Sequence, residues 1–230
     1  DGIFTADPRI VPKARKLDKI SYDEILELAS MGAQVVHVRS VELAKKYNVP
    51  IRVRSSFNNS IGTLICKEVM EMEDIVVSGA TVTKNDAKIT IIGVSDEPGQ
   101  AAKIFHELAK ENINVDMIIQ NISAHGLTDV TFTVQKDDLP LALETTERIK
   151  KEIQAKEIVA DDKIAKLSVV GIGMRTHSGI ADKMFKTLSD EKINIQMIST
   201  SEIKISCVIE EDQAEKALNS MHDAFELDKE

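Results

Sequence analysis

The sequence predicts an α+β protein made of two ferredoxin-like βαββαβ sandwiches, the first inserted in the second, preceded by the remnant of an α/β domain. Three observations carry this prediction. The chain contains an internal repeat, each copy alternates strand-like and helix-like periodicity, and the second copy lacks a strand that an orphan segment ahead of the first copy can supply.

The repeat relates residues 88–121 to residues 166–201. At an offset of 78, Lys88 and Gly93 match Lys166 and Gly171. After a two-residue insertion the offset becomes 80, and the further identities are Gly99 with Gly179, Ala101 with Ala181, Phe105 with Phe185, Leu108 with Leu188, Ile113 with Ile193, Asn114 with Asn194 and Met117 with Met197. Chance does not align so many identities, so the chain carries a duplicated unit.

Residues 1–68 do not share the repeat pattern, and their predicted elements indicate the end of an α/β domain. A loop-rich basic stretch with Pro8 and Pro12 comes first, and the periodicity of apolar residues marks the elements after it. The predicted elements are a helix capped by Ser21 that reaches about Met31, a helix over 41–47, strands over 51–54 and 63–67, and a linker over 68–73.

The first copy reads as a complete sandwich over residues 86–162. An apolar strand, a glycine-containing loop and an amphipathic helix come first, and the rest follows the split βαβ pattern. The predicted elements are strands over 89–94, 114–120, 129–134 and 157–160, a helix around Ile104, Phe105 and Leu108, and a helix over 139–153.

The second copy is short of one strand. Its predicted elements are strands over 167–172, 195–198 and 203–209, a helix around Met184, Phe185 and Leu188, and a helix over 213–225. The strand-like stretch 74–84, in contrast, has no unit of its own. Because an empty sheet position leaves backbone groups unpaired, we expect residues 75–83 to fill it, so that the second sandwich comprises residues 74–85 plus 163–230.

Composition argues against two classes of partner. The chain has 29 Lys+Arg against 38 Asp+Glu, a formal charge of −9, and only 3% of its residues are aromatic. Nucleic-acid binding needs a basic surface, and single-strand binding needs aromatic platforms, so no nucleic acid is expected as a partner. No run of about 18 apolar residues occurs, so no membrane insertion is expected.

Cysteine and histidine spacing indicates neither disulfides nor metal. Cys66 and Cys207 lie far apart without a CxxC pattern, which favours buried strand positions in a reducing, cytoplasmic compartment. No metal site is expected, because no ligand-type spacing connects the histidines, which are His37, His106, His125, His177 and His222. The chain begins at Asp1 without a signal-peptide pattern, and we expect its natural start to lie upstream.

Five stretches carry a resemblance to a known family. They are DGIFTADPRIVPKARKL at 1–17, SVELAKKYNVPIRVRSSF at 40–57, SDEPGQA at 95–101, QNIS at 120–123 and STSEIKIS at 199–206. Together they resemble the C-terminal half of bacterial aspartate kinases (aspartokinases), over essentially the whole chain. The resemblance implies that residues 1–68 end an amino-acid-kinase domain and that both sandwiches are ACT domains, which sense small molecules.

The resemblance also implies an activity and its regulation. In that family ATP phosphorylates L-aspartate to 4-phospho-L-aspartate, the first step of lysine, threonine and methionine biosynthesis, and lysine or threonine inhibits by binding the ACT domains. The similarity begins inside the family's nucleotide-binding segment. It therefore implies that this fragment holds no catalytic residue, is inactive alone and has no cofactor, since ATP and Mg²⁺ belong to the intact enzyme.

A nucleotide-binding remnant follows from the same resemblance. Its matching positions are Phe4, Asp7, Arg9 and Lys13, and the basic side chains among them suit phosphate. From the residues alone, a solvated basic turn is the simpler interpretation of Arg9, Lys13, Arg15 and Lys16.

An amino-acid effector presents a carboxylate and an ammonium group. Carboxylates suit helix N-termini, and the loops 95–101 and 175–181 each precede a helix and contain a glycine that lets a ligand approach the backbone. The candidate effector positions, mostly assigned by resemblance, are Asp96, Gly99, Ala101, Asn114, Val115, Asp116 and Gln120 in the first sandwich and Asn194, Ile195, Ser201 and Glu202 in the second. The carboxylates of Asp96 and Glu202 would suit the ammonium group.

Alternatives remain open at these positions. Asp96, two residues before Pro98, also fits a helix N-cap, a role compatible with binding. Gln120 and Asn121 could simply end a strand. The two copies differ most in their loops, however, and that difference favours unequal ligand duties over pure scaffolding.

The expected partners are lysine, threonine or both as effectors, and a second copy of the chain, since the resemblance implies a homodimer formed through ACT domains. One rival is a structural dimerisation module that binds no amino acid. Another is a complete catalyst, against which stands the lack of a glycine-rich phosphate loop followed by Lys. The sequence does not choose between lysine and threonine.

Overall fold

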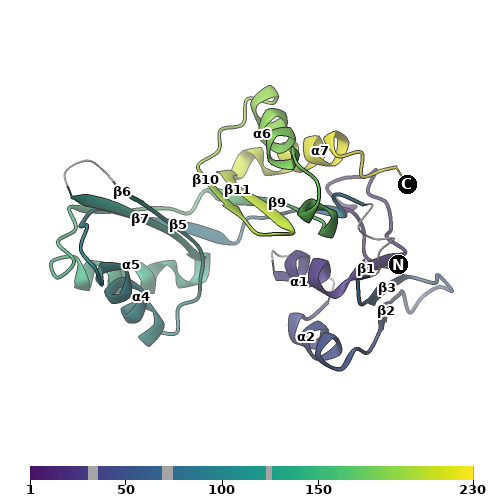
Figure 1. Cartoon of the computed structure of the whole chain (residues 1–230), viewed down its shortest axis with the longest axis horizontal. Helices are drawn as coiled ribbons and strands as arrows, with labels where there is room; N and C mark the ends of the chain where they lie inside the picture. Colours follow the sequence, from purple (N-terminus) through teal and green to yellow (C-terminus); the bar gives the residue numbers. More distant parts are fainter. Residues whose placement is uncertain (31–35, 69–74, 123–125, 230) are drawn as a thin grey trace. The chain divides into compact units, whose positions relative to one another are not determined.

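The computed structural model describes residues 1–30, 36–68, 75–122 and 126–229. The chain forms two compact units, one made of residues 84–164 and the other of residues 1–83 together with 165–230 (Figure 1). The strands of the described residues make three sheets, two of four strands and one of three. Among the described residues, no helix has both the length and the apolar character needed to cross a bilayer.

The unit of residues 84–164 is a four-stranded antiparallel sheet with two helices, and we call it the first sandwich. Its elements are β5 (Asp86–Ser95), α4 (Gln100–Lys110), β6 (Val115–Ile122), β7 (Leu127–Gln135), α5 (Leu139–Ile149) and β8 (Glu157–Asp161), in the sheet order β6-β7-β5-β8. Ile91 and Phe132 of the sheet are fully buried with Ile104 and Leu108 of α4. The Phe105 ring meets the Phe132 ring edge-on at a centroid distance of 5.6 Å.

The second sandwich repeats this arrangement with a strand taken from elsewhere in the chain. Its elements are β4 (Gly79–Thr83), β9 (Ile164–Val170), α6 (Ile180–Asp190), β10 (Met197–Thr200), β11 (Lys204–Glu210) and α7 (Ala214–Ala224), in the order β10-β11-β9-β4. β4 pairs antiparallel with β9, with Thr83 opposite Lys166 and Gly79 opposite Val170. The predicted pairing is therefore confirmed for residues 79–83, and the first sandwich is inserted in the second.

Two matching glycines show that β4 and β8 play equivalent parts. A Cβ atom on Gly171 would lie 2.3 Å from the carbonyl oxygen of Val76, which leads toward β4. A Cβ atom on Gly93 would lie 2.7 Å from the Lys156 side chain, which directly precedes β8. In both copies the chain entering the fourth strand thus passes against a position where a side chain does not fit.

Residues 1–68 form a small α/β layer. Its elements are β1 (Lys19–Ser21), α1 (Tyr22–Ser30), α2 (Val38–Tyr47), β2 (Ile51–Val53) and β3 (Thr63–Cys66), and β3 lies between β1, to which it is parallel, and β2, to which it is antiparallel. The strand β1 was not predicted, because its three residues include a single apolar one, too few to indicate alternation, unlike those of β2. Met31 and the predicted linker residues 69–73 lie outside the described part of the chain.

Residues 1–68 and the second sandwich pack as a single unit with interlocking cores. Ala6 and Val11 belong to the same apolar cluster as Leu167, Met184 and Leu218 of the second sandwich. Conversely, Val170 of β9 is buried in the cluster that holds α1 against its own sheet. Burial of one segment's apolar side chains in the other's core ties the two parts together.

Some element ends differ from the predictions. The strand predicted over 167–172 stops at Val170, and Ile172–Arg175 forms a 3₁₀ turn, η2. The helix predicted over 139–153 ends at Ile149, and the strand predicted from 195 begins at Met197. These are boundary shifts of the kind that local periodicity does not resolve.

The insertion makes a stringent deletion experiment possible. Because Thr83 and Lys166 lie opposite each other, replacing residues 84–165 by Asn-Gly should close β4 and β9 into a two-residue hairpin and leave the remaining unit folded. Residues 84–164 alone should also fold, since all four strands of their sheet are present. Thermal unfolding monitored by circular dichroism would show a cooperative transition for each product. Loss of cooperative unfolding in the Asn-Gly chain, matching that of a control that also lacks residues 79–83, would contradict the inserted topology.

Candidate functional site

The loops that precede α4 and α6 are open and uncapped. Gly99 and Gly179 are the residues before these helices, with φ angles of 99° and 89°, and neither helix start receives a side-chain cap. A Cβ atom on either glycine would meet nothing within 4 Å. Open space therefore borders both helix starts. The Gln100 N–H donates to the carbonyl of Glu97 at 3.4 Å, and a carboxylate could approach the N–H groups that follow it.

The structure decides against the alternative in which Asp96 caps the helix. Gly99 holds the N-cap position instead, since α4 begins at Gln100, and Asp96 lies exposed in the loop. The Asp96 backbone N–H donates to the carbonyl of Gly126 at 3.0 Å, which fixes the loop while leaving the carboxylate outside the helix. Gln100, which the sequence analysis passed over, is buried, and its Oε1 atom has no hydrogen-bond partner among the described residues.

The candidate effector residues of the first sandwich lie at two ends of the sheet. Ser95, beside the loop of Asp96 and Gly99, pairs with Leu127, whereas Val115 and Ala87 lie in the row of Val134. Ala87 and Ser95 are eight residues apart on one strand, a span of about 26 Å at roughly 3.3 Å per residue. One sandwich thus brings Asp96, Gly99 and Ala101 together but keeps them far from Asn114, Val115 and Asp116. Gln120 lies between these two groups, opposite Val130.

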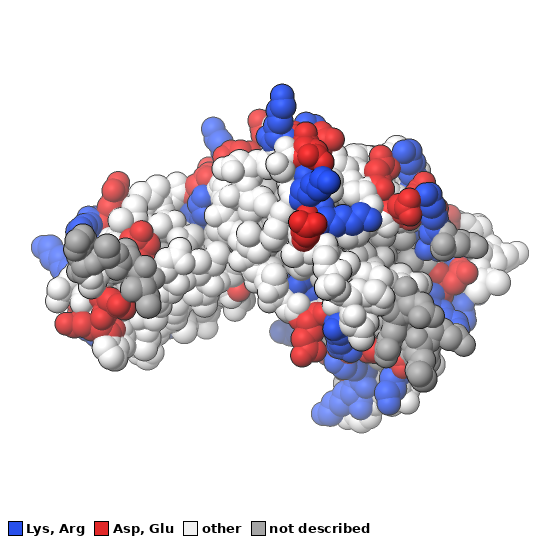
Figure 2. All heavy atoms as spheres, turned by 45° about the horizontal axis from the view of Figure 1, so that its top comes forward, with Lys and Arg blue, Asp and Glu red and all other residues white. Residues whose placement is uncertain are grey.

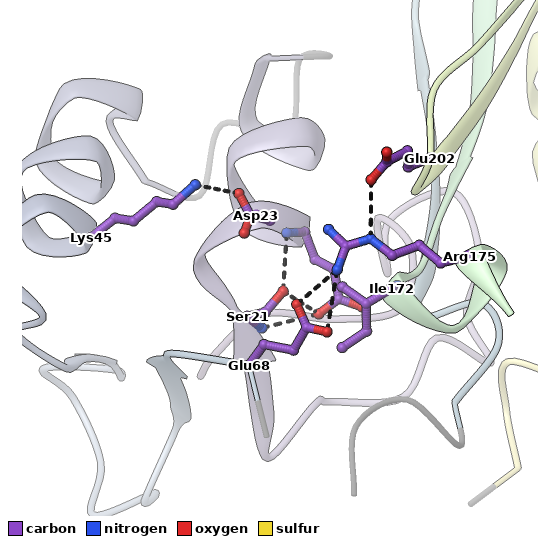
Figure 3. A network of polar contacts seen from close by, with 8 residues as sticks. Ser21, Asp23, Lys45, Glu68, Ile172, Arg175 and Glu202 are labelled. Carbon is purple, nitrogen blue, oxygen red and sulfur yellow. Dashed lines mark hydrogen bonds and ion pairs between the residues drawn. The ribbon is translucent and has the colours of Figure 1, made fainter. Parts of the chain in front are cut away.

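The second sandwich divides its candidates in the same way. Asn194 and Ile195 precede β10, and Ser201 and Glu202 follow it. Glu202 is exposed, and its carboxylate lies 3.5 Å from Nε of Arg175 in η2 (Figure 3). The other side of the same guanidinium reaches the carboxylate of Glu68 at 3.1 Å. Arg175 therefore bridges a candidate effector residue to the end of the N-terminal layer.

A buried carboxylate joins the N-terminal layer to the second sandwich. Glu24, only 1% exposed, accepts hydrogen bonds at Oε2 from the backbone and hydroxyl of Ser21, at 3.0 and 2.7 Å. The Ser21 hydroxyl in turn accepts from the Glu24 backbone at 3.2 Å, which completes a capping box and confirms Ser21 as the helix cap. Oε1 accepts from the Ser78 hydroxyl and from the Ile172 backbone at 3.2 Å, and Figure 3 shows Ser21 and Ile172 in this network.

Thr5 makes a second connection between the same two parts. Its carbonyl accepts from the backbone of Ala80 in β4 at 2.8 Å, and its hydroxyl lies 3.0 Å from Nε2 of His222 in α7. The backbone of Arg15 donates to the same hydroxyl oxygen at 3.0 Å, so the hydroxyl contacts both Arg15 and His222. Two elements of the second sandwich thus hold the segment that contains Phe4 and Asp7.

Most of the predicted nucleotide-binding remnant surrounds one cavity. Phe4, Asp7 and Arg9 line a space of about 310 Å³, whose opposite wall includes Ala80 of β4 and Leu218 of α7. Arg9 is paired with Asp7 through Nη2 at 2.7 Å, and the hydrogen bonds from Arg9 hold the pKa of Asp7 below its usual range. Lys13 does not line this cavity.

The interpretation as a solvated basic turn fits Arg9 and Lys13 but not Arg15. Arg9 and Lys13 are exposed, and Lys13 pairs with Asp223 at 3.2 Å, as a solvated turn would have them. Arg15 is half buried, with its Nε atom inaccessible to solvent, which a solvated turn does not explain.

The surface charges are mixed. Figure 2 shows Lys and Arg side chains interleaved with Asp and Glu over the face in view. Among the described residues, no three His, Cys, Asp or Glu side chains gather as metal ligands would. Cys207 is buried in β11, and burial raises the pKa of its thiol to about 12, so it is unreactive, while Cys66 at the end of β3 is half buried.

Comparison with known proteins gives consistent matches. The ACT domain family matches residues 89–148 and 167–225, and the amino acid kinase family matches residues 1–55. An aspartate kinase of Pseudomonas putida is 51% identical over 229 residues, which are 99% of this chain and 56% of that protein. The chain therefore spans little more than half the length of this relative.

Solved structures agree with these matches. A chain in a crystal structure of aspartokinase alpha and beta subunits is 48% identical, with a TM-score of 0.62, over 65% of this chain and 99% of that one. Escherichia coli aspartokinase III in complex with lysine and aspartate, in its T state, has a TM-score of 0.75 at 25% identity, over 97% of this chain and 49% of that one.

The Glu24 connection predicts a large difference between two neighbours on α1. Glu24→Ala leaves the buried donors of Ser21, Ser78 and Ile172 without their acceptor. It should lower the free energy of unfolding by about 2–4 kcal/mol. Glu27→Ala removes only a partly exposed ion pair with Lys204 and should cost about 1 kcal/mol or less. Urea denaturation measures both, and equal losses would show that Glu24 does not join the two parts.

The Thr5 connection predicts a dependence of stability on pH. Burial lowers the pKa of His222, with Lys13 adding to the effect and Asp223 and Asp228 opposing it. The unfolded chain therefore takes up a proton near pH 6.5 before the folded chain does, so the stability is present above that pH and is lost as the pH falls below it. His222→Gln, which keeps a hydrogen-bonding group near Nε2, should lose less stability between about pH 7 and 5.5. Parallel pH profiles of wild type and variant would exclude this role.

Proposed function

Because this chain belongs to the aspartokinase family and contains two ACT domains, we propose that it is the regulatory portion of an aspartate kinase, which transfers phosphate from ATP to L-aspartate, and that it binds lysine, threonine or both as feedback inhibitors. The observation that carries the proposal is the pair of uncapped helix starts beside Gly99 and Gly179, with open space above them. The lysine complex of the Escherichia coli relative supports it.

The first sandwich offers the chemistry that an amino acid needs. The N–H groups at the start of α4, next to Gly99 and Ala101, receive the effector carboxylate. The carboxylate of Asp96, free of the capping role, receives its ammonium group. The amide of Gln120, exposed on β6, adds a donor and an acceptor.

The separation along the sheet supports a homodimer. An amino acid is far shorter than the distance between Asp96 and Asn114, Val115 and Asp116, so these two groups serve one ligand only if another ACT domain supplies the second end. β6 and β10 are both edge strands, and each exposes an isoleucine at the matching position, Ile118 at 53% and Ile198 at 42%. Pairing of such edges between two copies would cover these side chains and align the two ends.

In the second sandwich, effector binding has a route to the N-terminal layer. An ammonium group at Glu202 competes with Arg175 for the same carboxylate, and Asn194, Ile195 and Ser201 complete the contacts by resemblance. A movement of Arg175 would alter its ion pair with Glu68. Because Arg175 and Ile172 both belong to η2, it would also alter the hydrogen bond from the Ile172 backbone to Glu24. A coupling of about 1–3 kcal/mol, the usual size for allosteric enzymes, needs the loss of only one or two such bonds.

In this proposal, the N-terminal layer contains the nucleotide-binding residues on which the regulation acts. Phe4, Asp7, Arg9 and Lys13 are the proposed nucleotide-binding remnant, and ATP and Mg²⁺ serve the intact enzyme rather than this chain. We propose that the chain alone is catalytically inactive and that the enzyme is cytoplasmic. Because Thr5 is bonded to β4 and α7, a shift of the second sandwich moves this segment directly.

Titration calorimetry of the chain with lysine, threonine and methionine tests the proposal. Lysine or threonine should release heat and raise the melting temperature. Asp96→Asn should weaken binding by about tenfold, equivalent to about 1.4 kcal/mol, whereas Glu97→Gln, an identical charge change on the next residue, should leave it unchanged. Sedimentation of the same samples would show a dimer. A dimer that binds none of the three amino acids would instead support a purely structural ACT module.

A further inference from the structure

A second cavity, of about 470 Å³, lies between the N-terminal layer and the second sandwich within their common unit. Its walls come from the segment around Arg15, from residues 75–78, from the first turn of α6 and from the residues after α7. It includes none of the candidate effector residues, and Phe4, Asp7 and Arg9 line the other cavity. Its chemistry is therefore independent of both sites discussed so far.

Arg15 is the unusual feature of this cavity. Its backbone is fixed, because its N–H donates to the Thr5 hydroxyl and its carbonyl accepts from the Thr5 backbone. Its side chain is half buried, and Nε has no solvent exposure and no hydrogen-bond partner among the described residues. No carboxylate of the described residues forms an ion pair with this guanidinium. Buried arginine donors are normally paired, so the unpartnered Nε beside a cavity makes Arg15 suited to bind an anion.

The remaining charges leave the cavity positive. Lys229 pairs with Glu226 at 2.7 Å, and the hydrogen bond from Lys229 keeps the pKa of Glu226 below its usual range. These two charges cancel. Lys183, in the first turn of α6, has its Nζ 5.0 Å from the centre of the Phe225 ring and forms no ion pair with the described residues. Among the described residues, neither Arg15 nor Lys183 has a carboxylate within ion-pairing distance, although Asp18 interacts with Arg15 and Glu226 with Lys183 at longer range.

The other walls strengthen this attraction. Leu17, Val77, Ile180 and Leu227 line the cavity with apolar surface, and a low local dielectric increases the interaction between a cation and an incoming anion. The guanidinium presents a planar set of donors that matches two oxygens of one oxyanion. From the unpaired Arg15, the second cation and the apolar walls, we propose that this cavity binds a small molecule bearing a phosphate or carboxylate group through Arg15 and Lys183.

The bound ligand would link the N-terminal layer to the second sandwich. Arg15 belongs to the N-terminal layer and Lys183 to the second sandwich, so an oxyanion between them adds a contact to those made by Glu24 and Thr5. Its occupancy stabilises the unit by mass action.

Calorimetric titration of the full chain with inorganic phosphate and, separately, with succinate tests this site at constant ionic strength. At least one of the two should bind, and Arg15→Met and Lys183→Met should each weaken it by about tenfold or more. Lys186→Met is the matched control, since Lys186 is exposed on the same helix, one turn further on, and does not line the cavity. It should leave the affinity unchanged.

The outcomes separate cleanly. Binding of phosphate alone identifies phosphorylated ligands, and binding of succinate alone identifies carboxylates. Absence of binding by both, or equal affinity in wild type and the two cavity variants, overturns the assignment. Arg15→Met keeps the backbone bonds to Thr5, and a melting curve verifies its folding; if it does not fold, Lys183→Met decides. Neither result bears on lysine or threonine binding, so the proposed effector function stands or falls separately.

Discussion

The structure of the larger unit depends on the need to satisfy a single buried carboxylate. Glu24 has four donors, two from its own helix start and two from Ser78 and Ile172, which are 54 and 148 residues away. Withdrawing a carboxylate from water is costly unless donors replace the water, so α1, the entry to β4 and the turn η2 can take up this arrangement only together. A regulatory domain that shares such a group with its neighbour cannot move without disturbing it.

Two kinds of connection thus meet in this unit. The burial of Ala6 and Val11 in the core of the second sandwich is a non-directional apolar interaction. It keeps the N-terminal layer and the second sandwich packed together. The polar contacts of Glu24, Thr5 and Arg175 are directional and have discrete alternatives, which is the property that a signal between two sites requires. In the proposed function, an amino acid that competes at Glu202 would act on the second kind while the first keeps the unit intact.

The sequence predicted the architecture well because the architecture depends on features that are local or repeated. The duplicated identities gave the two sandwiches, and the count of strands gave the insertion of one in the other, which β4 confirms. The cap at Ser21 was predicted, and the spacing of Ser21 and Glu24 is also that of a capping box, a local signal that the prediction left unused. Ser78 and Ile172 lie too far along the chain to be linked to Glu24 by any pattern. Capping by Asp96 stayed open as an alternative because Pro98 is typical of a helix start, whereas the structure has Gly99, with its positive φ, at the N-cap. Arg15 was hidden among neighbouring basic residues, and only its burial distinguishes it from them.

The inserted topology also sets the order in which the chain can mature during synthesis. β4 leaves the ribosome before the whole of residues 84–164, and its partner β9 follows only after them. At roughly 5–20 residues per second, β4 waits several seconds for β9 while the strands of the first sandwich are made one after another. The second sandwich is thus begun first and finished last. The nascent protein carries an unpaired strand through that interval, so its safe folding depends on how quickly the ribosome delivers the next eighty residues.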